Sequence, residues 1–244
     1  RIRVHSADRV EPSCPVARQC GGCQLQFMSY AAQLQFKENK VKNNLMRIGG
    51  FDQIPFEPII GMKHPLRYRN KAQFPIGRDK NGNLIAGFYA GRTHSIIDHH
   101  DCALGVEENR EILEIILEHM RRNGIPPYDE ATGEGLIRHV MIRSGFHTGQ
   151  IMVCIVINGK KIAAEDKLCY RLAKVPGMTS VTVSVNTDKT NVIMGQEVRS
   201  LWGKNYIEDE IGPIRYQISP LSFYQVNPVQ TEHLYGTALE YAGL

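Results

Sequence analysis

The sequence has no run of apolar residues approaching the roughly 18 needed to cross a membrane. Its first residues, RIRVHSADRV, contain no apolar core of the kind found in secretory leaders. Its 22 glycines and 12 prolines are near average usage for 244 residues, which excludes collagen-like and low-complexity chains. These absences predict a soluble, cytoplasmic protein with no membrane partner.

The chain is long and apolar enough to bury a substantial core. Its 244 residues include 42% hydrophobic and 22% charged side chains, which excludes a disulfide-stapled miniprotein and a disordered tail. The chain begins at Arg1 without a methionine and stops where a helical pattern is ending. We therefore expect it to be part of a longer polypeptide, and the sequence indicates no obligate protein partner.

Positive charge is concentrated in one short segment. The whole chain has a formal net charge of +4, and residues 63–80, KHPLRYRNKAQFPIGRDK, contain six basic residues and one acidic residue. This segment has a balance of +5, so the other 226 residues sum to −1. Such a confined excess is typical of a nucleic-acid contact surface, although a solvated basic hairpin would give the same count.

Hydrophobic periodicity predicts helices over residues 30–48, 107–123 and 162–174. Strands are predicted on either side of Asn81-Gly82, a pair that suits the positive φ angles of a tight turn. RHVMIRSG with QIMVCIVING, and later IEDEIGPIRYQI, are typical of hairpins, and NVIMGQEV of a further strand. VTVSVN alternates valine with polar residues, which predicts a strand with one buried face. Hairpins outnumber crossover units, so we predict an α+β fold: a mostly antiparallel sheet with helices on one side.

The pattern changes near Pro220. Asn227 suits a helix N-cap, Pro228 suits the first helical position, and Gly243 suits a helix stop. These signals predict a helix over residues 228–242 that opens a further domain.

The six cysteines fall into two kinds. Cys154 lies in the apolar run IMVCIVI and Cys169 in the helical KLCYRL, so both are predicted to be ordinary buried thiols. CPVARQCGGC instead puts three thiols, Cys14, Cys20 and Cys23, within ten residues of a glycine-containing loop. Such thiolates can share one metal centre if the backbone folds tightly, and Cys102 in DHHDCALG is the candidate fourth ligand.

Spacing alone leaves the nature of that centre open. A thioredoxin-type C-x-x-C pair normally follows a βαβ strand, which is missing here. Zinc and an iron–sulfur cluster can both be held by four cysteines, and His99 and His100 could also bind zinc.

Several motifs in order along the chain carry a resemblance. C-x5-C-G-G-C-x78-C, YRNKAQFPIG, GFYAGRTHSIIDHHDC and ISPLSFYQVNP resemble the bacterial uracil-C5 RNA methyltransferases, the RNA m5U methyltransferase family. The similarity runs from Arg9 to Leu244. It is closest to members that act on 23S ribosomal RNA and carry a [4Fe-4S] cluster.

The resemblance implies a division into three domains. Residues 1–13 would end an N-terminal oligonucleotide-binding barrel of the TRAM type. Residues 14–219 would form an iron–sulfur and central RNA-binding domain, with a helix over 28–48 that packs on the methyltransferase domain. Residues 220–244 would begin a C-terminal Rossmann-like domain that binds S-adenosyl-L-methionine.

The resemblance also implies the site residues. Cys14, Cys20, Cys23 and Cys102 would hold the [4Fe-4S] cluster in a structural and RNA-orienting role. Gln225, Phe223 and Asn227 would line the pocket of the methyl donor.

The family's chemistry is not complete in this segment. Its cysteine nucleophile attacks C6 of uracil, and a base later removes the proton from C5. None of the six cysteines matches the nucleophile, and the glycine-rich cofactor loop is missing, so these 244 residues alone are predicted to be inactive.

What remains for this segment is recognition of 23S ribosomal RNA. The basic segment offers Arg67, Arg69 and Lys71 for phosphates, and Tyr68 and Phe74 for base stacking. For the two aromatic residues, burial in the core is an equal alternative. Arg138 is a weaker RNA candidate, as are His139 and Arg143. The rival interpretation of the whole chain is a non-catalytic RNA-binding module stabilised by zinc.

Overall fold

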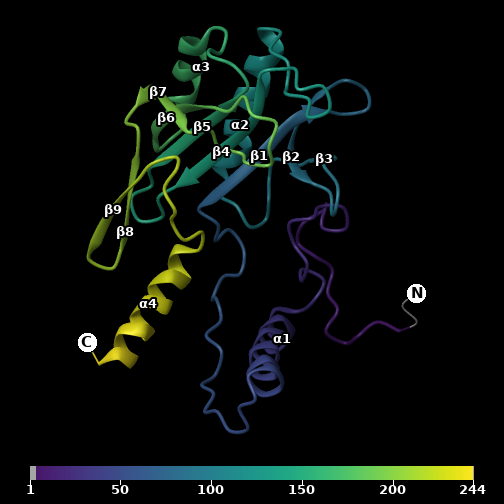
Figure 1. The fold of residues 1–244 in the computed structure, drawn as a ribbon, viewed down its shortest axis with the longest axis vertical. Coiled ribbons are helices and arrows are strands. Elements are labelled where there is room, and N and C mark those ends of the chain that lie inside the picture. Colours follow the sequence, from purple (N-terminus) through teal and green to yellow (C-terminus); the bar gives the residue numbers. More distant parts are fainter. Residues whose placement is uncertain (1–3, 244) are drawn as a thin grey trace.

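The computed structural model describes residues 4–243, and one seven-stranded sheet organises most of them (Figure 1). The strand order is β3-β2-β1-β4-β5-β6-β7. Only β5 and β6 pair in parallel, so the predicted, mostly antiparallel sheet is confirmed. The strands are β1 (Lys71–Arg78), β2 (Leu84–Tyr89), β3 (Ile96–Asp98), β4 (Ile137–Ser144), β5 (Ile151–Ile157), β6 (Met178–Val185) and β7 (Glu197–Gly203).

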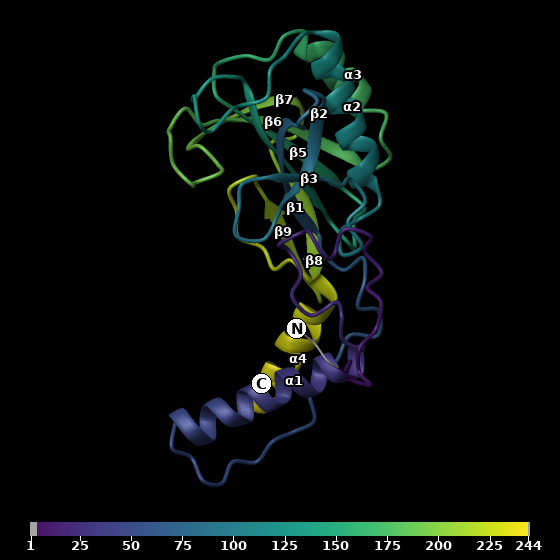
Figure 2. The same cartoon turned by 90° about the vertical axis from the view of Figure 1, so that its right-hand side faces the viewer.

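Two helices cover one face of this sheet (Figure 2). They are α2 (Glu108–Arg122) and α3 (Glu165–Leu172), and α3 is the crossover that parallel pairing of β5 with β6 requires. Alternate residues of the strands point at the helices and form one continuous core. Each fully buried Leu, Ile or Phe contributes about 1.5–3 kcal/mol to folding. Fully buried members of this core include Phe74, Ile112, Leu113, Ile116, Met120, Val140 and Ile155.

The opposite face is covered by a separate hairpin of β8 (Ile207–Ile211) and β9 (Ile214–Ile218). Ile207, Ile218 and Tyr224 pack there against Met141 and other residues of β4 and β5. The hairpin is fixed by the fully buried Asp209, which accepts hydrogen bonds from the backbone N–H of Phe146 and His147 and from the Tyr224 hydroxyl. Both faces of the central strands are therefore buried.

Two features differ from the sequence prediction. In the β1–β2 turn only Gly82 has a positive φ, 83°, so the Asn81-Gly82 pair does not form a turn with two positive φ angles. The strand VTVSVN was expected to have one buried face, yet Thr182 and Ser184 are as fully buried as Val181 and Val183. The reason is that the polar side of β6 also packs against protein: the Thr182 hydroxyl donates to the Val153 carbonyl, and Ser184 Oγ donates to the Gly195 carbonyl.

Two further helices lie beyond the end of the sheet in both views (Figures 1 and 2). Helix α1 (Tyr30–Asn43) continues into a π-helical turn, η1 (Asn44–Ile48), and α4 (Pro228–Ala242) starts at the predicted N-cap Asn227. Residues 60–62 link them, because the Met62 N–H donates to the Tyr30 hydroxyl and the Gln230 amide donates to the Ile60 carbonyl. Neither α1 nor η1 contains a buried residue.

The remaining predictions about elements agree in kind and differ in bounds. The helix expected over 162–174 is shorter at both ends, and the strand expected at NVIMGQEV begins only at Glu197. The first three residues of the expected strand RIRV lie outside the described residues. Within the described residues, no helix has the length and apolar character that a membrane crossing requires.

Candidate functional site

The loop that carries Cys14, Cys20 and Cys23 folds as successive tight turns and docks on the end of β2. Within it, the Cys20 N–H donates to the Val16 carbonyl at 2.9 Å. The Gly21 N–H donates to the Tyr89 carbonyl at 2.9 Å, and Cys20 forms a bridge with Ala90. These backbone contacts hold the loop against the β2–β3 turn.

A side chain at position 21 would be crowded by backbone. A Cβ atom there would lie 3.0 Å from Gly91 Cα and 3.2 Å from the Tyr89 carbonyl oxygen. Both neighbours are backbone atoms, so they cannot rotate away as a side chain could. At Gly22 the nearest atom to an added Cβ would be Cys20 Sγ at 3.4 Å, which is ordinary contact. The C-G-G-C motif therefore contains one glycine at which a Cβ atom would crowd the backbone and one at which it would not.

Cys102 is brought to the same place by Arg67. The Arg67 guanidinium donates to the carbonyls of Cys102 and Gly105 at 2.9 and 3.2 Å, and pairs with Asp101 at 2.7 Å. The hydrogen bond between Arg67 and Asp101 lowers the pKa of Asp101 and raises the pKa of Arg67. Backbone N–H groups of Arg67 and Arg69 also bond to residues 103 and 104. Arg67 thus secures the Cys102 loop, and its guanidinium is already engaged there by protein groups.

All four cysteines line one cavity of about 320 Å³. Arg69 and Lys71 of the basic segment, His99 and Gln26 also line it, and no Asp or Glu among the described residues does. Burial is the main cause that raises the pKa of both Cys14 and Cys23, and the neighbouring cysteines raise it further. Buried thiolates that lie near one another repel. A bound cationic centre would offset that repulsion.

Whether these residues can hold one metal ion depends on how close their side chains lie. Among residues 4–243, no three His, Cys, Asp or Glu side chains are close enough to hold a single metal ion. Zinc bound by thiolates requires Zn–S distances of about 2.3 Å, so its ligands must nearly touch. The four thiols line one cavity without forming such a single-ion site.

Polar N–H groups are directed at the sulfurs. The Gly22 N–H lies 3.4 Å from Cys20 Sγ, and the Gln26 amide lies 3.2 Å from Cys23 Sγ. His99 Nε2 is 3.7 Å from Cys14 Sγ, whereas the other histidine considered as a zinc ligand, His100, is bonded to Asp98. Hydrogen bonds to cysteine sulfur are among the contacts that tune iron–sulfur centres.

The residues considered for RNA contact are in different environments. Arg69 and Lys71 line the cysteine cavity, and Tyr68 is half-buried beside it. Burial, with Arg143 and Arg69 nearby, lowers the pKa of Lys71. No carboxylate balances this group within the cavity walls that the structure describes, so it favours an anion.

Phe74 is buried, as the alternative in the sequence analysis expected, and so is Arg138, whose burial was not expected. Phe74 is fully buried against α2, with its ring 4.9 Å from that of Phe88, and has no face open to a base. Arg138 is buried, stacks on Tyr128 and donates to two loop carbonyls at 2.8 Å. The expected RNA contacts of these two side chains are therefore corrected: one is a core residue and the other anchors a loop.

The residues considered for the methyl donor follow β9 in one extended segment. Asn70 holds this segment through hydrogen bonds to the carbonyls of Gln225 and Val226. Phe223 is 86% exposed, and the Asn227 side chain caps α4. The segment thus presents the Phe223 side chain outward from a backbone fixed to the central sheet.

The other two cysteines are buried, as predicted. Burial raises the pKa of Cys154 and of Cys169 to about 11. Neither thiol is therefore a nucleophile at neutral pH.

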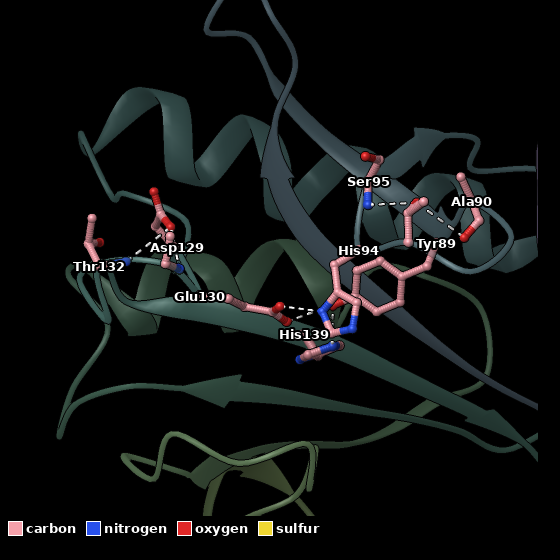
Figure 3. Close-up of polar contacts among 10 residues, drawn as sticks. Tyr89, Ala90, His94, Ser95, Asp129, Glu130, Thr132 and His139 are labelled. Atoms are coloured by element: carbon pink, nitrogen blue, oxygen red, sulfur yellow. Dashed lines mark hydrogen bonds and ion pairs between the residues drawn. The ribbon is translucent and has the colours of Figure 1, made fainter.

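The structure also brings together a polar cluster that the sequence analysis missed. Tyr89, His94, Glu130 and His139 come together from β2, the β2–β3 turn, the loop before β4, and β4 (Figure 3). Interleaved aromatic and basic residues in GFYAGRTH were the only signal in the sequence, and they did not indicate the partners from residues 130 and 139.

Comparison with known proteins links this fold to RNA methyltransferases. The chain is 48% identical over 244 residues to an uncharacterized RNA methyltransferase of Clostridium tetani, covering all of this chain and 53% of that protein. It is 48% identical over 240 residues to one from Halalkalibacterium halodurans, covering 98% of this chain and 52% of that protein. No protein-family model matches.

A solved structure matches as well. The tRNA (uracil-54, C5)-methyltransferase of Pyrococcus abyssi in complex with S-adenosyl-L-homocysteine superimposes with a TM-score of 0.73 at 27% sequence identity. The match covers 96% of this chain and 52% of that one. The chain therefore has the fold of about half of a uracil-C5 methyltransferase, and it spans about half the length of the curated relatives that it matches.

Proposed function

We propose that this chain is the iron–sulfur and RNA-recognition portion of an S-adenosyl-L-methionine-dependent methyltransferase that makes 5-methyluridine in 23S ribosomal RNA in the cytoplasm. One observation carries the proposal. Four cysteines from two distant segments line one cavity together with Arg69 and Lys71, and no described carboxylate lines it. The chain is also 48% identical to a protein named an RNA methyltransferase.

The cluster is assigned to Cys14, Cys20, Cys23 and Cys102. Their shared cavity and the N–H groups directed at the sulfurs of Cys20 and Cys23 support a thiolate-bound group of this kind. Bound there, the group would supply a cationic core that stabilises four thiolates. It would join two segments that are separated by 78 residues, and would so help to offset the entropy that closing this long loop costs on folding.

The chain's own residues would position the RNA. Arg69 and Lys71 offer positive charge to phosphates at the mouth of the cavity, and Tyr68 offers a ring for stacking. A uridine that reacts at C5 must leave its stack, at a cost of a few kcal/mol that such contacts offset. Arg67 acts indirectly, by holding the Cys102 loop beside Arg69.

The methyl donor is assigned to the segment after β9. Gln225, Phe223 and Asn227 would line its pocket, and the exposed Phe223 is available to contact further protein or cofactor. The bound S-adenosyl-L-homocysteine of the Pyrococcus abyssi enzyme supports this cofactor. The nucleophile and the base would come from the other half of the protein.

Transfer RNA is the second candidate substrate, because the matched structure is a tRNA methyltransferase. The full-length protein, purified without oxygen, would be given S-adenosyl-L-methionine and either 23S ribosomal RNA or tRNA transcripts. We expect a brown protein with broad absorbance near ~400 nm, iron and sulfide, and 5-methyluridine in 23S RNA only.

Each part of the proposal can fail separately. A colourless protein with one tightly bound zinc would reject the cluster. Methylation of tRNA alone would change the substrate, and no methylation of either RNA would favour the non-catalytic zinc-stabilised RNA-binding module.

A further inference from the structure

A second cavity, of about 530 Å³, has no cysteine in its walls. Its walls come from β1, β2, β3, β4 and the loop before β4. Ile76, Ile96 and Pro127 supply apolar surface, and Tyr89, His94 and Tyr128 supply aromatic rings. Sites for flat organic ligands share this composition: apolar and aromatic walls with a few polar groups.

The polar groups of this cavity form one connected cluster (Figure 3). The Tyr89 hydroxyl donates to a Glu130 carboxylate oxygen at 3.1 Å and lies 3.4 Å from His139 Nε2. The second carboxylate oxygen of Glu130 is bonded to His94 Nδ1. Because the Tyr89 proton is directed at Glu130, Nε2 of His139 must carry the proton that joins it to Tyr89.

This arrangement leaves His139 with an unmet hydrogen bond. His139 is only 7% exposed, and its Nδ1 atom has no partner in the described structure. A buried polar nitrogen without a partner is unusual in a native core and calls for an explanation. The His139 side chain lies in the wall of the cavity, edge-on to the Tyr89 ring with 6.5 Å between the ring centres.

The aromatic rings are arranged for stacking and one of them is accessible. The Tyr89 and His94 rings are 5.2 Å apart with a 30° angle between their planes. The His94 side chain is 65% exposed, so a planar group can reach this pair without any rearrangement of the core.

A third hollow shares wall residues with this cavity and with the cysteine cavity. This shallow depression over the β2–β3 turn shares Tyr89 and His94 with the first and Gly22 and Phe88 with the second. A strand of nucleic acid could follow this path without leaving the surface.

Each section of this path carries positive charge. Arg69 and Lys71 lie at the cysteine cavity, Arg92 at the turn, and Arg78 at the far cavity. Carboxylates line only the last section among the described residues: Glu130 is engaged by His94 and Tyr89, and Asp129 accepts hydrogen bonds from the backbone N–H groups of residues 131 and 132. A phosphate backbone would therefore meet cations along the whole path.

We propose that this cavity is a second nucleotide subsite, which binds an unpaired base of single-stranded RNA on Tyr89 and His94. The inference rests on the proposed RNA-binding function and adds a subsite remote from the cysteine cluster. The bound base stacks on the two rings, and its backbone continues past Arg92 to Arg69 and Lys71.

The test uses the full-length protein, purified without oxygen, and two probes: a short single-stranded RNA of mixed sequence and the same backbone without bases. His94→Ala removes an exposed ring, and Tyr89→Leu removes the ring beneath it. Tyr170→Leu is the matched control, because Tyr170 is 66% exposed on α3 and lies outside the path.

We expect His94→Ala and Tyr89→Leu each to weaken binding of the RNA by about 5- to 160-fold, the range for loss of one base–aromatic stack. Binding of the abasic backbone should not change, and Tyr170→Leu should not affect either probe. The exposed His94 keeps the test informative if Tyr89→Leu does not fold.

Three other results would overturn the inference. If the unchanged protein binds RNA and His94→Ala binds it equally well, the subsite is wrong and the proposed function stands. If His94→Ala weakens both probes equally, the effect is not on a base. If the unchanged protein binds neither probe, the proposed function fails and the subsite fails with it.

Discussion

Phe74 shows why a residue in a basic segment needs its burial known before a role is assigned. Its neighbours Arg69 and Lys71 line a cavity, while its ring is enclosed between the sheet and α2. Alternation along a strand places adjacent residues on opposite faces, and the sequence could not say which face of β1 met the helices.

A conservative substitution separates the two roles. Phe74→Leu should lower the free energy of unfolding by about 1 kcal/mol, because it roughly preserves core volume, and should leave RNA affinity unchanged below the unfolding transition. Tyr68→Leu should weaken RNA binding and leave the free energy of unfolding nearly unchanged. Urea unfolding and a binding titration on each variant would check this, and a loss of RNA affinity in Phe74→Leu that its stability does not explain would contradict it.

His139 makes stability depend on pH. Burial, and to a lesser degree Arg138, lowers its pKa from 6.5 to about 4, against a smaller opposing effect of Glu130. Between these values the unfolded chain binds a proton that the folded protein does not, so the free energy of unfolding falls as the pH falls. The difference reaches at most about 3 kcal/mol.

Urea unfolding at pH 7.5, 6 and 5 would measure this contribution. We expect the unchanged protein to lose stability over that range and His139→Gln to lose less, because the carboxylates titrate mainly below it. Equal losses in the two proteins would show that His139 is not held neutral by the fold.

At the scale of elements, the cysteine loop depends on how closely its backbone approaches the β2–β3 turn. Gly21→Ala would force its Cβ against the backbone of Gly91, whereas Gly22→Ala would add only an ordinary contact. We expect Gly21→Ala to bind several-fold less iron per chain than the unchanged protein, and Gly22→Ala to bind about as much.

These neighbouring variants control for each other, because each adds one methyl group to the same C-G-G-C motif. Iron content and visible absorbance after oxygen-free purification would give the comparison. If the two variants lost iron equally, the loss would come from reduced flexibility of the loop in general. Close docking at Gly21 would then not explain it.

The elements also show what the sequence could and could not predict. Periodicity identified α2, β4, β5 and the cap of α4, because local signals determine them. It misjudged β6, since burial of its polar side depends on contacts with other parts of the chain. The cysteines were recognisable by spacing, whereas the role of Arg67 depends on a loop 35 residues away.

At the scale of the whole molecule, electrostatic attraction to RNA depends on where the cations lie rather than on how many there are. The net charge of +4 is small, yet Arg69, Lys71 and Arg92 lie along a path of neighbouring hollows. Lys160 and Lys167 are exposed near α3, outside that path. Removing two charges at either place changes the net charge by the same amount.

The double variant Arg69→Gln and Lys71→Gln should weaken RNA binding and reduce its salt dependence. Loss of two contacts with single-stranded RNA lowers the slope of log affinity against log salt by about 1.4. Lys160→Gln with Lys167→Gln should leave both the affinity and the slope unchanged. Binding titrations over a salt series, with absorbance of the cluster as the check that both variants fold, would measure the effect. Equal slopes for the two double variants would show that net charge, and not this path, attracts the RNA.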